Sequence, residues 1–159
     1  MNNLDIKKIS ESLQNKILLG IEFYDKSNDG EDSCLELTFS ESYKLIIQTF
    51  CRIYDDERIY AMDSERYLLP NYEAPESDYQ NLPFKNSLLS KDLEIVREKC
   101  LNAIVKNVRI SETNDIYVEL NNAFTIQGII HCRCKSYLYY GLFCNGHDVV
   151  KCCIDWENY

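Results

Sequence analysis

Glycine, proline and histidine are scarce in this chain, and their scarcity narrows the range of functions. Only five glycines, three prolines and two histidines occur among 159 residues. The sequence contains neither a glycine-rich loop that would cradle phosphates nor a Gly-x-Ser-x-Gly segment, so nucleotide binding and the usual serine chemistry are not expected. No local pattern supplies a nucleophile, a base and an orienting group together. We therefore expect a protein that is not an enzyme.

Long apolar runs are missing as well. No stretch approaches the roughly 20 apolar residues of a membrane-spanning helix. Residues 1–5 show neither the basic segment nor the apolar segment of a secretion signal. A cytoplasmic protein without a membrane partner is expected. The eight cysteines are then expected to be reduced, mostly buried thiols, because disulfides belong to oxidising compartments.

Basic residues are outnumbered. The chain has 17 Lys and Arg against 26 Asp and Glu, a formal net charge of −9. Nucleic acids select a cationic face, so they are not expected as partners, and no cofactor is indicated. Between Tyr54 and Tyr79 alone, eight acids stand against two bases. The charge is therefore concentrated in one segment, and it suits a cationic partner.

The most informative feature that is present is an internal repeat. Residues 5–23 align with residues 92–110 at an offset of 87 (92 − 5), and residues 37–52 align with residues 118–133 at an offset of 81 (132 − 51). A repeat of this kind indicates two copies of one supersecondary unit. A chain of this length is short for two independent cores, so the copies are expected to share one.

The apolar periodicity predicts the unit itself. Helical spacing places Ile9, Leu13 and Ile17 on one face, and Val96, Cys100 and Ile104 repeat that face. Alternation then predicts strands. The prediction is an α+β fold, a single domain over residues 1–159, whose two pseudo-repeats are each a helix plus an antiparallel β-meander. The expected helices are 4–16 and 92–104, the strands 19–23, 35–39, 43–54, 58–62, 105–110, 116–120, 124–133, 137–144 and 149–156, the pseudo-repeats 4–66 and 92–156, and the loop between them 67–90.

Tyrosines accompany the acids. Of twelve tyrosines, several lie in or beside the acidic segment, which continues into a long connection without periodicity. Tyr is enriched at protein interfaces, and carboxylates around it steer a cationic partner. A solvated acidic face, with the tyrosines covering a sheet, is the alternative. The residues expected to bind the partner are Asp55, Asp56, Glu57, Tyr60, Asp63, Glu65, Tyr72, Glu73, Glu76, Asp78 and Tyr79.

Cysteines and a histidine in the second half offer another function. Cys132, Cys134, Cys144 and His147 can converge if their strands pair across the Asn-Gly turn at 145–146, and three thiolates with one imidazole are a set that binds zinc. A small zinc-binding module is therefore the alternative function. Buried structural thiols are the default interpretation of the same residues. A thiol enzyme, with a histidine activating Cys132 or Cys144, is a third interpretation.

Two arginines fall at equivalent positions of the repeat. Arg52 and Arg133 lie inside apolar strands, where a guanidinium needs a carboxylate partner. We expect Asp63 beside Arg52 and Asp148 beside Arg133. Anion binding by the arginines is the alternative.

Several segments resemble a known family. LELTF at 35–39, YKLII at 43–47 and CRI at 51–53, followed by an acidic turn and Asp63, are similar to small two-repeat bacterial immunity proteins encoded beside polymorphic or contact-dependent toxins. The resemblance implies a protein that blocks a toxin by binding it one to one. Together with the acidic surface, it predicts a stoichiometric inhibitor of a cationic toxin domain, with a nuclease domain as the expected target.

Overall fold

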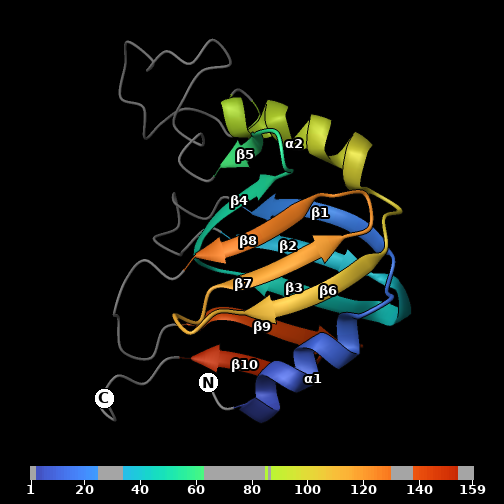
Figure 1. Ribbon diagram of the computed structural model, residues 1–159, viewed down its shortest axis with the longest axis vertical. Helices are drawn as coiled ribbons and strands as arrows, with labels where there is room; N and C mark the ends of the chain where they lie inside the picture. Colours follow the sequence, from blue (N-terminus) through green and yellow to red (C-terminus); the bar gives the residue numbers. More distant parts are fainter. Residues whose placement is uncertain (1–2, 25–33, 63–84, 86, 130–137, 154–159) are drawn as a thin grey trace.

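The computed structural model describes residues 3–24, 34–62, 85, 87–129 and 138–153. In these residues the fold is mostly antiparallel β-sheet, with ten strands in two five-stranded sheets and two helices (Figure 1). The predicted α+β class, with two helix-plus-meander repeats, is wrong. Each sheet combines three strands of one half of the chain with two strands of the other, so neither half forms a sheet of its own.

The first sheet takes its last two strands from the second half of the chain. Its order is β1-β2-β3-β9-β10. Every neighbouring pair is antiparallel. The strands are β1 (Leu18–Tyr24), β2 (Cys34–Phe39), β3 (Tyr43–Ile47), β9 (Leu138–Cys144) and β10 (His147–Cys153), with a short 3-10 turn, η2 (Ser40–Ser42), between β2 and β3.

The second sheet has the reciprocal composition. Its order is β5-β4-β8-β7-β6, again antiparallel throughout. Strand β4 of the first half pairs with β8 of the second half, just as β3 pairs with β9 in the other sheet. The strands are β4 (Phe50–Tyr54), β5 (Ile59–Met62), β6 (Val105–Ile110), β7 (Ile116–Leu120) and β8 (Thr125–Ile129).

The chain passes from one sheet to the other within a segment that we predicted as one strand, 43–54. The structure divides it into β3 and β4, separated by Gln48 and Thr49. Burial alternates without interruption through this break, because Ile47, Thr49 and Cys51 are all buried. A period of two therefore continues across the crossing, which explains why the sequence pattern does not reveal it.

Two helices close the open sides of the sandwich. Helix α1 (Asn3–Leu13) contacts the edge strands β6 and β10, whereas α2 (Leu88–Cys100) contacts the edge strands β5 and β1 (Figure 1). Helix α2 begins before the predicted residue 92, because the Ser87 hydroxyl caps it by accepting a hydrogen bond from Ser90 N at 3.2 Å. The predicted loop 67–90 therefore ends earlier than expected.

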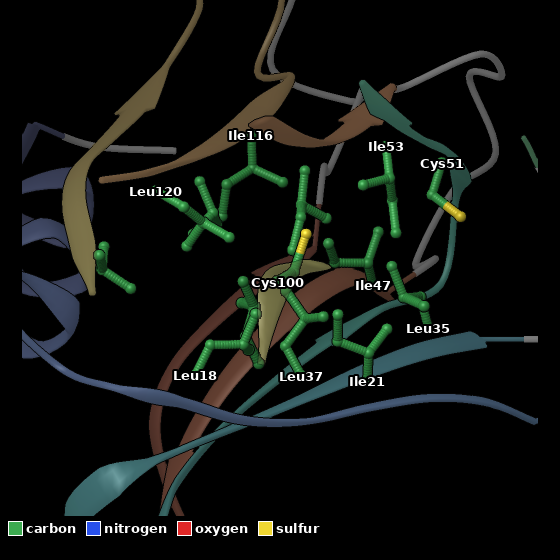
Figure 2. Packing of buried hydrophobic residues seen from close by; sticks show 14 of the residues in the cluster. Leu18, Ile21, Leu35, Leu37, Ile47, Cys51, Ile53, Cys100, Ile116 and Leu120 are labelled. Carbon is green, nitrogen blue, oxygen red and sulfur yellow. The ribbon is translucent and has the colours of Figure 1, made fainter. Parts of the chain in front are cut away.

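The core lies between the two sheets. Figure 2 shows Ile21, Leu37 and Ile47 of the first sheet facing Ile53 and Ile116 of the second, and each of these side chains is at most 1% exposed. Removing such side chains from water is the main term that stabilises the sandwich.

Neither of the two described helices is long and apolar enough to cross a membrane.

Candidate protein-binding site

Four turns gather at one end of the sandwich, which we call the turn end. They are the β2–β3 turn (40–42), the β4–β5 turn (55–58), the β7–β8 turn (121–124) and the β9–β10 turn (145–146). The register places the start of β3 beside the end of β9 and the end of β4 beside the start of β8. The β2–β3, β7–β8 and β9–β10 turns lie on the right in Figure 1, whereas the β4–β5 turn lies higher in the view, beside α2.

The β4–β5 turn carries the described part of the predicted acidic site. Asp55 Oδ1 accepts hydrogen bonds from Glu57 N at 2.9 Å and Arg58 N at 3.0 Å, so its side chain fixes the turn. Asp56 and Glu57 are exposed. Desolvation acts to raise the pKa of Asp55, but the hydrogen bonds from Glu57, Arg58 and Tyr60 lower it, and the net pKa lies below its ordinary value.

Removing the Asp55 carboxylate should loosen this turn. Asp55→Ala is expected to speed hydrogen exchange at the amides of Glu57 and Arg58, whereas Asp55→Asn, which keeps an acceptor, should retain much of the protection. In the natural protein the carboxylate accepts best when charged, and its pKa is lowered. The protection should therefore persist above that lowered pKa and be lost as pH falls through it, as amide exchange followed by NMR can measure. Unchanged exchange in Asp55→Ala would contradict the assignment.

Tyr60 lies on β5 in a setting that the sequence did not indicate. Its ring is 4.8 Å from the ring of Phe124 and lies under the Arg58 guanidinium at 4.2 Å and the Lys99 ammonium at 5.5 Å. Hydrogen bonding to Tyr60 raises the pKa of Arg58. The acidic turn thus has cationic neighbours, and this part of the surface carries both signs of charge.

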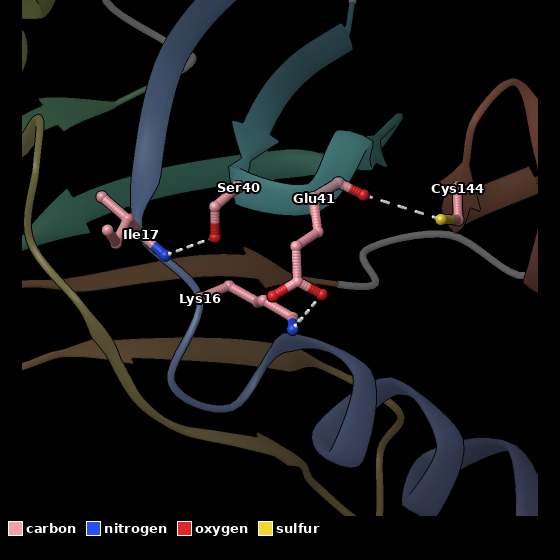
Figure 3. A network of polar contacts seen from close by, with 5 residues as sticks. All are labelled: Lys16, Ile17, Ser40, Glu41 and Cys144. Carbon is pink, nitrogen blue, oxygen red and sulfur yellow. Dashed lines mark hydrogen bonds and ion pairs between the residues drawn. The ribbon is translucent and has the colours of Figure 1, made fainter.

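The β2–β3 turn is tied to the rest of the turn end by a polar network. Figure 3 shows Lys16 Nζ against Glu41 Oε2 at 2.6 Å, Ile17 N donating to Ser40 Oγ at 3.1 Å, and the Cys144 thiol donating to the Glu41 carbonyl at 3.8 Å. Lys16 is largely buried, with 19% of its side chain exposed, whereas 68% of the Glu41 side chain is exposed. The Glu41 side chain is therefore much more exposed to solvent than the Lys16 side chain.

Two of the four predicted zinc ligands belong to the described residues. Cys144 and His147 stand opposite each other at the base of the β9–β10 hairpin, as expected, whereas Cys132 and Cys134 lie outside the described residues. The described part of the chain brings together no group of three or more metal-ligating side chains. Among the other cysteines, burial raises the pKa of the Cys100 thiol to about 12, which makes it a poor nucleophile.

Only one residue of each predicted arginine–aspartate pair belongs to the described residues. Arg52 Nε donates to the buried Gln127 Oε1 at 2.7 Å, and its guanidinium lies 5.2 Å from the Tyr54 ring. Asp148, predicted beside Arg133, pairs with Lys151 at 2.8 Å, and its pairing with Arg133 stays a prediction. The expected partners outside the described residues are Asp63 and Arg133, and the expected binding residues there are Asp63, Glu65, Tyr72, Glu73, Glu76, Asp78 and Tyr79.

A groove of about 530 Å³ runs beside the turn end on the outer face of the first sheet. Ile46 and Phe143 line it together with Lys44 and the two nearest turns. Lys44 Nζ lies 2.7 Å from Glu36 Oε1, and the hydrogen bond with that carboxylate raises the pKa of Lys44. Sequence reasoning missed this groove, because β3 and β9 are far apart in the chain.

Comparison of the chain with protein-family models, with curated proteins and with solved structures finds no match.

Proposed function

We propose that this protein is a stoichiometric inhibitor that binds a cationic protein toxin domain, with a nuclease domain as its target, in the manner of an immunity protein acting in the cytoplasm. The observation that carries the proposal is the β4–β5 turn. It holds the exposed Asp56 and Glu57 on a backbone that Asp55 fixes with two hydrogen bonds, beside the aromatic ring of Tyr60.

The chemistry of such a turn suits a nuclease. An enzyme that binds nucleic acid presents cations to the phosphates. Carboxylates held in fixed positions can occupy the same cations, and they lose little conformational freedom on binding because the turn is already ordered. The net charge of −9 would speed the encounter with a basic partner, and this effect weakens as salt is added.

The first test is native mass spectrometry of the protein purified from its own cells. The expected result is a one-to-one complex with a basic polypeptide. A chain that carries no polypeptide, or that forms a complex with an acidic one, would overturn the proposal. A bare chain heavier by one zinc ion would instead favour the zinc-binding module.

The second test reverses charge at the turn. Asp56→Lys and Glu57→Lys are each expected to weaken binding of the co-purified polypeptide by about tenfold at low salt, mainly through slower association. The matched control is Glu112→Lys, an exposed glutamate in the β6–β7 turn at the opposite end of the sandwich. Binding kinetics at two salt concentrations provide the measurement. Equal effects of all three changes would show that the turn has no special role.

A further inference from the structure

Exposed apolar side chains concentrate at the turn end. Six large hydrophobic residues are exposed in the described part of the chain, and four of them begin strands or adjoin turns at this end. Large apolar side chains that remain exposed together, with polar residues around them, mark interaction surfaces. The four are Ile17 (39% exposed), Leu19 (51%), Ile59 (47%) and Ile104 (39%).

Ile17 and Ile104 form the centre of this group. They come from the two helix–strand junctions and face each other in an isolated antiparallel bridge. Residues directly opposite in such a bridge have Cβ atoms about 4.5–5.5 Å apart and side chains on the same face. Two half-exposed isoleucines from opposite halves of the chain therefore make one continuous apolar spot.

The backbone beneath this spot is held by reciprocal hydrogen bonds. Leu18 N donates to the Ala103 carbonyl and Val105 N donates to the Lys16 carbonyl, both at 2.9 Å. The adjoining turns add hydrogen bonds on either side, between Ser40 and Ile17 and between Asn121 and Ile104. The two side chains are thus presented by a fixed backbone, so a partner that covers them loses little binding free energy to ordering this segment.

Charged side chains of both signs lie around the spot. Glu41, whose side chain is 68% exposed, belongs to the turn that is hydrogen-bonded to Ile17, and its partner Lys16 is mostly covered. On the other side, the β7–β8 turn links Ile104 to the acidic β4–β5 turn through the contact between Phe124 and Tyr60. An apolar centre with a charged rim is the usual anatomy of a protein interface.

We infer that the Ile17–Ile104 pair is the apolar centre of the surface that binds the inhibited protein, and that it receives an aliphatic or aromatic side chain ringed by lysine or arginine on that partner. The inference rests on the proposed function and adds an apolar anchor to it. Charge complementarity selects this occupant, because Glu41 is the more exposed member of its ion pair with Lys16 and the chain as a whole carries a net charge of −9.

The test truncates the two isoleucines singly. Ile17→Ala and Ile104→Ala are each expected to weaken binding of the co-purified basic polypeptide by about tenfold, mostly through faster dissociation, because each removes apolar area that the partner covers. The matched control is Ile95→Ala, an isoleucine of α2 with 42% exposure, which should change binding less than twofold. Thermal unfolding of all three variants checks that they remain folded.

The outcomes separate this inference from the proposed function. If the lysine variants at Asp56 and Glu57 weaken binding while both isoleucine variants bind normally, the apolar centre is wrong and the inhibitor proposal stands. If no basic polypeptide co-purifies, the proposed function fails, and a short peptide alternating leucine and lysine then probes the surface directly. NMR shift changes centred on Ile17, Ile104 and their adjoining turns would support the inferred chemistry, and changes centred elsewhere would overturn it.

Discussion

Replacing Ile47 with alanine is expected to lower the free energy of unfolding by about 3–4 kcal/mol. Ile47 lies on β3, the middle strand of the first sheet, and its side chain is fully buried against the second sheet (Figure 2). The substitution removes three carbons from a site with sheet on both sides, so the surroundings can close the cavity only in part. Urea denaturation followed by circular dichroism measures the change.

The neighbouring residue provides the control. Ile46 belongs to the same strand but points to the outer face, where it lines the groove. Ile46→Ala should therefore cost less than about 1 kcal/mol, because little buried area is lost. Equal losses at the two positions would contradict the orientation of β3, since a strand shifted by one residue exchanges its two faces.

Most strand positions could be predicted from alternation alone. The segments 35–39, 105–110 and 116–120 were predicted to within one residue of β2, β6 and β7. Alternation reports which residues face the core, and buried leucine, isoleucine and valine at every second position made these segments clear. It does not report which strand lies alongside, and that is why the fold class was wrong.

The pairing of strands depends on contacts that no local pattern records. Strands β9 and β10 join a sheet begun by β1, more than 100 residues earlier. The helical spacing of apolar residues also extends beyond the ends of the real helices. It predicted Ile17 and Ile104 on the apolar helix faces, whereas both helices end earlier and each of the two residues is 39% exposed. Asn15 and Asn102 have positive φ, and Leu101 at the end of α2 is already extended, so the helical path ends before both isoleucines.

The candidate surface was predictable only in part, because it too depends on contacts between distant segments that no local pattern records. Composition located the acids at 55–57, because charge density needs no knowledge of the fold. Lys99 beside Tyr60 could not be foreseen, since it reaches the ring only when α2 packs against β5. The apolar centre was missed because it exists only where two junctions 87 residues apart meet (104 − 17).

Gly128→Val is expected to lower the free energy of unfolding by about 3 kcal/mol through overpacking. Gly128 lies on β8, the middle strand of the second sheet. A Cβ added there would stand 2.7 Å from Ile47 Cγ2 of the opposite sheet and 3.0 Å from Ile116 Cγ2. The first contact is too short for two carbon atoms and the second is very tight, so the two sheets approach this closely because the residue has no side chain.

Combining the two core substitutions tests whether they occupy the same space. Gly128→Val adds three carbons and Ile47→Ala removes three, so the double variant conserves the volume of the core, and such exchanges are tolerated best. We expect its cost to be at least about 1 kcal/mol below the sum of the single costs. Gly146→Ala should cost about 1 kcal/mol for a different reason, its φ of 79° with open space around it. Ile47→Ala should not relieve the cost of Gly146→Ala, so the costs of these two substitutions should simply add. If the costs of Gly128→Val and Ile47→Ala also simply added, β3 and β8 would not face each other across the core.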